Sequence, residues 1–327
     1  MQKTRRVYSG IRSSGRLHIG NYLGAIKGML KLQETHDCIF GVVDLHGIMS
    51  PFDPRTLQQD IREVVLDYLA AGLDPKKCHL MIQSQVPEHV ELAFLFSTIY
   101  PVSRLEQLPT YKEKKLGQPD YVNMGLLYYP ILMAADILIY KVELVPVGKD
   151  NVPHIEVTRE IARKFNRIFK PIFPETKRFA TKGELIPSLS GSGKMSKSIK
   201  GSFIEMGDDL KTIKQKLAKT PTDVGHGKEV SKEGGVANLL LLVELFMGKK
   251  TRDDYEKKYL GKGIKYQELK EKLAQAIYKE LKPIQKKRRY YEDHPQEVDE
   301  ILEEGRKYCS KIAKETLREA KEAMGLI

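Results

Sequence analysis

The segment that decides the fold is Arg6-Val-Tyr-Ser-Gly-Ile11, near the start of the chain. Its β-branched and aromatic residues are typical of a short strand. A Ser/Gly turn at residues 12–15 follows, and a helical pattern then runs from about residue 20 to residue 34. We therefore expect a strand, a turn and a helix in succession.

The turn has the composition of a phosphate-binding loop. Its small residues Ser13, Ser14 and Gly15 let backbone N–H groups approach a ligand, and His18 and Asn21 stand at the start of the next helix. A helix N-terminus favours negative charge, so this segment can bind the phosphates of a nucleotide. A simple helix cap has the same composition, so the turn alone does not decide between the two.

Three further apolar runs are expected to be strands: residues 38–43, 79–83 and 144–147. Between them lie helical patterns, one opening at Asp53-Pro54, one over residues 130–140 and one over residues 155–168. Alternating strands and helices with nearly continuous apolar strands predict an α/β fold, a Rossmann-like parallel sheet covered on both faces. Ligands of such sheets bind at the carboxyl ends of the strands.

Composition narrows the function. Of the 327 residues, 41% are hydrophobic and 30% are charged, and the net charge is +12. The charge favours a polyanionic partner such as nucleic acid, although a lysine-rich surface alone would give the same value. No apolar run reaches the roughly 20 residues of a membrane span, and no secretory signal opens the chain, so we expect a cytoplasmic protein. The cysteines, Cys38, Cys78 and Cys309, are too far apart for a zinc site and are expected to be buried and reduced.

From about Asp208 onward the pattern is helical, and a Ser/Gly/Lys-rich stretch at residues 189–201 joins the two regions. This stretch contains Lys194-Met-Ser-Lys-Ser198. Two lysines in a Gly-flanked loop suit closure over a triphosphate and stabilisation of charge on departing pyrophosphate. A solvated lysine loop is the alternative.

Two motifs, taken together, resemble those of a known enzyme family. His18-Ile-Gly-Asn21 and Lys194-Met-Ser-Lys-Ser198, in this order and at this separation, are similar to the two signatures of class I aminoacyl-tRNA synthetases. Tyr129-Pro-Ile-Leu-Met-Ala-Ala-Asp-Ile137, Val145-Pro-Val-Gly148 and His154-Ile-Glu-Val-Thr-Arg-Glu160 resemble the bacterial-type tryptophanyl-tRNA synthetases, and the likeness covers essentially the whole chain. A tyrosyl-tRNA synthetase is the nearest rival, and a non-catalytic paralogue that binds RNA or senses tryptophan is a second.

The resemblance implies an ATP site and catalytic residues at matching positions. The ATP site takes in Arg12, Ser13, Ser14, Gly20, Asn21, Gly148, Lys149, Asp150, Ile186, Lys194, Met195, Ser196, Lys197 and Ser198. The residues implied to act in catalysis are His18, Asn21, Lys194, Lys197 and Ser198. Ser13, Lys149 and Asn151 depart from the common family pattern, which puts affinities for ATP and tryptophan in doubt but not the class.

The resemblance also implies a tryptophan pocket, in which the Asp136 carboxylate accepts the indole N–H. Its other residues are implied to be Tyr8, His46, Tyr129, Met133, Val147 and Asn151. An apolar pocket with one acceptor suits indole, which has a large apolar body and one donor. We expect the Asp136 carboxylate to be left unpaired when the bound amino acid offers no donor, because its sequence neighbours are apolar.

The family implies a two-step reaction with Mg²⁺ on the ATP phosphates, transfer of tryptophan to tRNA, and a homodimer. It also implies a Rossmann-like catalytic domain over residues 1–205, with residues 296–327 packing back on it, and an all-helical anticodon-binding domain over 206–295. Within the latter, Lys282-Pro-Ile-Gln-Lys-Lys-Arg-Arg-Tyr-Tyr291 has the cations and aromatics of an RNA site, or of a solvated basic helix face.

Overall fold

The computed structural model describes residues 5–148, 151–179, 186–197, 199 and 201–327. The chain divides into two compact units. Unit 1 comprises residues 1–15, 25–184 and 291–327, and unit 2 comprises residues 16–24 and 185–290. The boundary expected at residue 205 separates a catalytic domain from an anticodon-binding domain, so it divides the chain by function. Unit 2 is defined by packing alone: it contains the helical region together with the two signature segments, residues 18–21 and 194–198.

Unit 1 is built on a five-stranded parallel sheet in the order β3-β2-β1-β4-β5. The strands are β1 (Arg6–Ile11), β2 (Asp37–Val42), β3 (Cys78–Ile82), β4 (Leu144–Pro146) and β5 (Lys177–Phe179). The parallel sheet confirms the predicted fold class. β5 was not anticipated, because three residues with two charged side chains carry no alternating apolar pattern.

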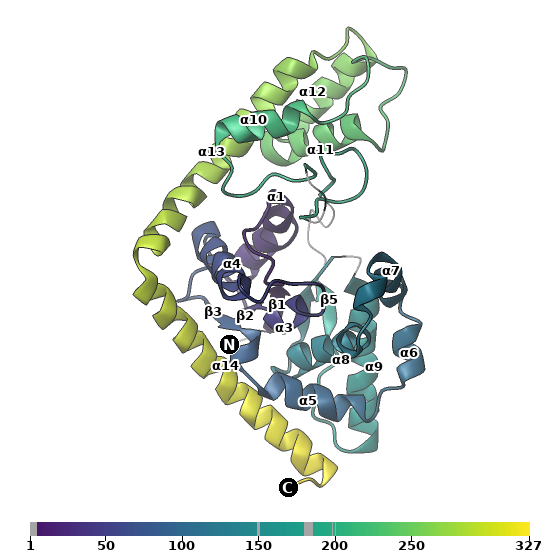
Figure 1. Ribbon diagram of the computed structural model, residues 1–327, viewed down its shortest axis with the longest axis vertical. Helices are drawn as coiled ribbons and strands as arrows, with labels where there is room; N and C mark the ends of the chain where they lie inside the picture. The colour runs from purple at the N-terminus through teal and green to yellow at the C-terminus, as the bar shows by residue number, and fades with distance from the viewer. Residues whose placement is uncertain (1–4, 149–150, 180–185, 198, 200) are drawn as a thin grey trace. The chain divides into compact units, whose positions relative to one another are not determined.

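Helices cover both faces of the sheet, with α4 (Leu57–Ala71) on one side and α8 (Met124–Leu138) and α9 (Val152–Ile168) on the other (Figure 1). The Tyr68 hydroxyl on α4 donates to the Gly41 carbonyl, which ties this helix to β2. α4 ends at Gly72, whose φ of 113° favours glycine. α8 begins at Asn123, whose side chain accepts from the Leu126 N–H.

The remaining helices of unit 1 surround this frame. They are the short α3 (Asp44–Gly47), α5 (Glu88–Ser97), α6 (Val102–Glu106), α7 (Pro109–Gly117) and α2 (Lys27–Leu32). The last helix, α14 (Pro295–Met324), packs directly on β3. A β-carbon at Gly305 would lie 1.8 Å from the Leu80 carbonyl oxygen, so only glycine permits this approach.

Unit 2 is helical. It contains α1 (Ile19–Asn21), the first part of a π-helical segment (Tyr22–Ile26), α10 (Leu210–Ala218), α11 (Gly235–Met247), α12 (Lys249–Leu260) and most of α13 (Tyr266–Asp293). Its core is formed by buried aliphatic side chains, including Leu239, Val243, Leu273 and Ile277. The Tyr259 and Tyr266 hydroxyls both donate to the Asp223 carboxylate.

Two expectations from composition can be compared with the structure. Cys38, Cys78 and Cys309 are all buried and free, as predicted. Within the described ranges, no helix is both long and apolar enough to span a bilayer.

Candidate functional site

Polar residues of unit 1 gather where the parallel strands end. Arg12–Ser14 follow β1, the short helix α3 with His46 follows β2, Gln83 follows β3 and Val147-Gly148 follow β4. Because carboxyl ends of parallel strands share one edge, these residues meet at the part of the sheet where ligands of such folds bind. The edge is therefore the candidate site.

α8 presents one face to this edge. Tyr129, Met133 and Asp136 stand at positions i, i+4 and i+7 of the helix, which places them on the same side. Asp136 is 1% exposed, Tyr129 is buried and Met133 is partly buried against the core. Three of the residues assigned to the tryptophan pocket are thus neighbours by helical periodicity alone.

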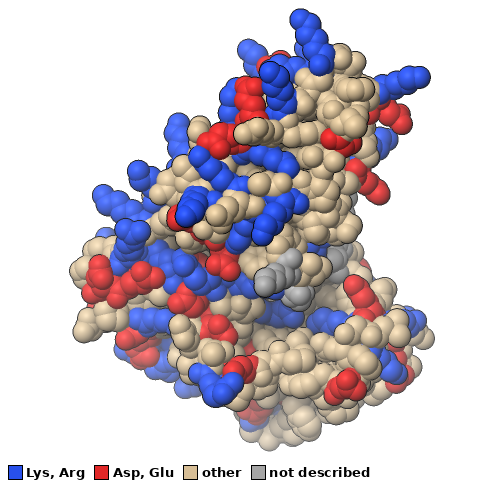
Figure 2. Space-filling view, turned by 45° about the horizontal axis from the view of Figure 1, so that its top comes forward, with Lys and Arg blue, Asp and Glu red and all other residues tan. Residues whose placement is uncertain are grey.

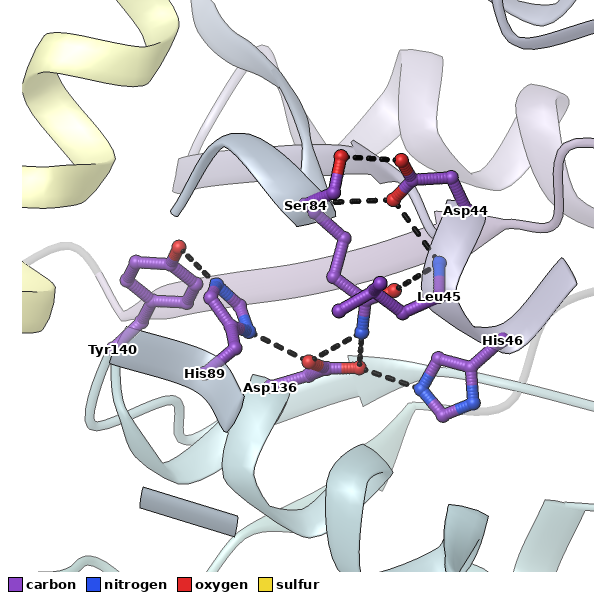
Figure 3. A network of polar contacts seen from close by, with 8 residues as sticks. Asp44, Leu45, His46, Ser84, His89, Asp136 and Tyr140 are labelled. Carbon is purple, nitrogen blue, oxygen red and sulfur yellow. Dashed lines mark hydrogen bonds and ion pairs between the residues drawn. The ribbon is translucent and has the colours of Figure 1, made fainter. Parts of the chain in front are cut away.

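The Asp136 carboxylate is the centre of a buried hydrogen-bond network (Figure 3). His46 Nε2 lies 2.8 Å from Oδ2, and His89 Nδ1 lies 2.6 Å from Oδ1. The Gln83 amide donates to both oxygens, at 2.8 and 2.9 Å. The expectation of an unpaired carboxylate is therefore wrong: three donors from α3, the β3 terminus and α5 satisfy it without any ligand.

The network decides the charge of Asp136. Burial alone would raise the pKa of this carboxyl, but the hydrogen bonds and charges of His46 and His89 outweigh burial and hold its pKa well below the ordinary value. The group is an ionised acceptor throughout the neutral range. Such an acceptor suits a ligand N–H, including that of an indole ring.

Aromatic rings line the region next to the carboxylate. The Tyr8 and Tyr140 rings are stacked with centroids 5.7 Å apart, and the His46 and Tyr129 rings meet edge to face at 6.3 Å. The Tyr129 hydroxyl lies 2.8 Å from Thr110 Oγ1. The implied pocket residues Tyr8, His46, Tyr129 and Asp136 are thus brought together, and Val147 packs against the same core.

In unit 2, the two signature segments are in contact. A β-carbon at Gly20 would lie 3.3 Å from the Met195 Cβ. The lysine loop is held by the Met195 N–H, which donates to the Ile186 carbonyl at 3.0 Å, and by a bridge between Lys194 and Pro187. The structure therefore places residues implied to bind ATP side by side, although they lie far apart in the sequence.

His18 is the buried member of this contact. Burial, together with the nearby positive charge of Lys197, lowers the pKa of its imidazole to about 4. Its backbone N–H donates to Asn21 Oδ1, and its ring lies 5.7 Å from the Phe203 ring. A neutral imidazole beside lysines can hydrogen-bond to a phosphate without adding charge.

The remaining residues implied to bind ATP or tryptophan lie at the end of β1, at the start of α9 and in the lysine loop. Ser13 is buried beneath Gly47, while Arg12 and Ser14 are exposed at the end of β1. Asn151 is the N-cap residue just before α9, and its N–H donates to the Gly148 carbonyl. Ser196 exchanges hydrogen bonds with Ser202. Lys149, Asp150 and Ser198 lie outside the described residues.

Three residues of unit 1 near the candidate site were not predicted from the sequence. Gln83 and His89 bind Asp136, and Lys114 Nζ lies 4.4 Å from the centroid of the Tyr129 ring. The position of Gln83 could have been predicted, because it is a polar residue directly after a buried strand. Those of His89 and Lys114 could not, since only tertiary packing brings α5 and α7 to this edge.

The basic segment at residues 282–291 forms part of helix α13, which exposes some of its side chains and buries others. Lys282, Lys286, Lys287, Arg289 and Tyr290 are exposed, whereas Arg288 and Tyr291 are buried and so belong to the packing of α13. The face of the molecule drawn in Figure 2 carries more Lys and Arg side chains than Asp and Glu side chains. One tyrosine and four cations of the segment therefore lie on the surface.

The fold and the candidate site together have the features of a class I aminoacyl-tRNA synthetase. These are a parallel sheet, a buried acceptor among aromatic side chains at its carboxyl edge, and two signature segments in contact. A family model described as "tRNA synthetases class I (W and Y)" matches residues 1–282. The chain belongs to this family.

Within the family, the chain is similar to the tryptophan–tRNA ligase of Halalkalibacterium halodurans, with 42% identity over 335 residues, covering all of this chain and 98% of the relative. Two solved tryptophanyl-tRNA synthetases are similar to this chain in structure. That of Campylobacter jejuni, complexed with ADP and tryptophan, superposes with a TM-score of 0.84 at 31% identity, covering 98% of this chain and 99% of that one. That of Mycoplasma pneumoniae gives 0.87 at 30%, covering 98% of each chain.

Proposed function

We propose that this chain is an ATP-dependent ligase that activates L-tryptophan and transfers it to tRNA. The tryptophan carboxylate attacks the α-phosphorus of ATP, the bond to the bridging oxygen breaks, and diphosphate leaves. The tRNA terminal hydroxyl then attacks the carbonyl carbon of the adenylate and AMP departs. The observation that carries the proposal is the ionised Asp136 in an aromatic pocket, supported by full-length relatives with this activity.

The residues have separate tasks in this proposal. Asp136 accepts the indole N–H, and Tyr8, His46, Tyr129, Met133, Val147 and Asn151 surround the amino acid. Lys194 and Lys197 stabilise charge on the leaving diphosphate, while neutral His18 and Asn21 hydrogen-bond to phosphate oxygens. No side chain forms a covalent bond to substrate, so catalysis rests on orientation and electrostatics.

Mg²⁺ is proposed to enter with ATP. Phosphate oxygens and water are ligands that Mg²⁺ accepts readily, with few protein groups. Among the described residues, no group of three or more His, Cys, Asp and Glu side chains could hold a metal ion.

Residues 1–205 with 296–327 are proposed as the catalytic domain and 206–295 as the anticodon-binding domain. The exposed cations Lys282, Lys286, Lys287 and Arg289 with Tyr290 support an RNA-binding role for α13. We also place the protein in the cytoplasm, where its tRNA substrate is charged.

A homodimer is proposed from the surface of unit 1. Val90 and Phe94 on α5, Val102 on α6, Leu116 on α7 and Met124 on α8 expose 48 to 84% of their surface. Apolar side chains exposed on consecutive helices are typical of a protein interface, and a second copy would cover them.

ATP–pyrophosphate exchange tests the proposal. Tryptophan should drive exchange strongly, tyrosine weakly and phenylalanine hardly at all. Faster exchange with tyrosine would make the chain a tyrosyl enzyme, the nearest rival. No exchange with either amino acid in the presence of Mg²⁺ would favour the non-catalytic paralogue.

A further inference from the structure

The donors around Asp136 differ in their access to solvent. The His46 side chain is 10% exposed, whereas that of His89 is fully buried. Figure 3 shows the two imidazoles on opposite sides of the carboxylate, with His46 from α3 and His89 from α5. A ligand therefore reaches the carboxylate from the His46 side, and the far side belongs to the protein interior.

Gln83 is held in one orientation. The Leu45 backbone N–H donates to Gln83 Oε1 at 3.1 Å, so the amide oxygen faces α3. The amide nitrogen must then face Asp136, where it donates to both carboxylate oxygens. A flip of the amide would set its oxygen against the carboxylate and leave the Leu45 N–H without this acceptor, so the plane of the carboxylate is fixed by the backbone of α3.

His89 is held in the same way from the other side. Its Nε2 lies 2.6 Å from the Tyr140 hydroxyl, and Tyr140 is fully buried. This contact holds the ring so that Nδ1 faces Asp136, where its N–H donates to the carboxylate. Cys309 of α14 also hydrogen-bonds to Tyr140, which extends the chain of contacts to the C-terminal helix.

We propose that Gln83 and His89 are positioning residues for amino-acid selection: fixed by the Leu45 amide and the Tyr140 hydroxyl, they hold the Asp136 carboxylate in the orientation that accepts the indole N–H. Neither residue needs to touch the substrate. The proposal rests on the function proposed above and identifies what sets its specificity.

The test compares tryptophan with 3-benzothienyl-L-alanine, in which sulfur replaces the indole N–H at nearly constant shape. The ratio of their kcat/KM values in pyrophosphate exchange isolates recognition of the N–H. Removing a hydrogen bond that orients a charged group should lower this ratio about 10-fold in Tyr140→Phe and more in Gln83→Leu. The loss should appear in KM for tryptophan, with KM for ATP unchanged. Tyr100→Phe, which removes a buried hydroxyl bonded to Glu160 instead, is the matched control.

Two further variants address His89 directly. Asparagine places a donor near the position of Nδ1 but cannot reach Tyr140, and leucine supplies no donor. His89→Asn should therefore retain more N–H discrimination than His89→Leu. In an Asp136→Asn background, Tyr140→Phe should have little further effect on the ratio, because it acts through the carboxylate.

The outcomes separate this proposal from the function on which it rests. If the wild-type protein gives no exchange with tryptophan, the proposed function fails. If the wild type is active but Tyr140→Phe, Gln83→Leu and His89→Leu lower both substrates equally, the residues are merely structural and the positioning proposal is overturned. A ratio unchanged in all three variants overturns it as well.

Discussion

Gly20 packs directly against Met195, so that a β-carbon at position 20 would lie 3.3 Å from the Met195 Cβ and 2.7 Å from His18 Nδ1. This packing joins the His18–Asn21 segment to the lysine loop within unit 2. A side chain at position 20 would therefore displace its neighbours.

Gly20→Ala should displace the His18 ring and lower the rate of adenylate formation about 10- to 100-fold, as small misplacements of catalytic groups do. Tryptophan binding should be unchanged, because its pocket lies in unit 1. The chain contains no tryptophan, so the change in ligand fluorescence on binding has no contribution from protein tryptophan. Gly117→Ala is the control, since no atom lies within 4 Å of its added carbon. Equal rates for both variants would contradict the role given to Gly20.

Lys197→Ala should slow adenylate formation by about two to three orders of magnitude, the usual effect of losing one transition-state donor. Tryptophan binding should again be nearly intact. Single-turnover kinetics measure the chemical step, with exposed Lys219→Ala as a control in the same unit. A normal single-turnover rate would refute the role of this lysine.

Asp136 variants should separate recognition from stability. Asp136→Asn should lower kcat/KM for tryptophan about 10- to 150-fold, because a hydrogen bond to a charged acceptor is removed. Asp136→Ala should also lower the free energy of unfolding by about 3 kcal/mol or more, since three buried donors lose their partner. Exchange assays and urea unfolding followed by circular dichroism give the two quantities. A stable Ala variant would mean that the network matters less than its geometry indicates.

The lowered pKa of His18 should make the free energy of unfolding depend on pH. Its pKa is about 4 in the folded chain, against a usual 6.5. Between pH 4 and pH 6.5 the unfolded chain binds more protons at this histidine than the folded chain does. The free energy of unfolding therefore rises with pH across this window, and the contribution of His18 is lost as the pH falls from 6.5 towards 4. His18→Asn should make this slope shallower by at most about 1.4 kcal/mol per pH unit. Urea unfolding across this range measures it, with exposed His226→Asn as the control; identical slopes for wild type and His18→Asn would exclude the assignment.

Binding of tRNA should weaken steeply with salt, because the cations of α13 displace counterions from phosphates. Removing one cation that binds a phosphate should reduce the slope of log K against log salt concentration by about 1. We expect this reduction for Lys286→Ala and none for Lys77→Ala, whose lysine pairs with Glu34 in unit 1. Filter binding at several salt concentrations gives the slopes, and a flat dependence would rule out this surface.

The sequence by itself determined the class of fold and the helical spacing of three candidate site residues. Nearly continuous apolar runs at residues 6–11, 38–43 and 79–83, alternating with helical patterns, favour a parallel sheet covered on both faces, and the structure has these strands within one residue of their expected bounds. The spacing of Tyr129, Met133 and Asp136 places them on one helix face whatever surrounds the helix. These are local properties, set by period and side-chain type.

Only the tertiary structure decided how Asp136 is held. Its neighbours in the sequence are apolar and suggested an unpaired carboxylate, but its partners come from helix α3, the end of β3 and helix α5. The same applies to Arg288 and Tyr291, which the sequence groups with their exposed neighbours and the fold buries. Hydrogen-bond partners and burial depend on which segments pack together, and packing over long sequence separations leaves no periodic pattern in the chain itself.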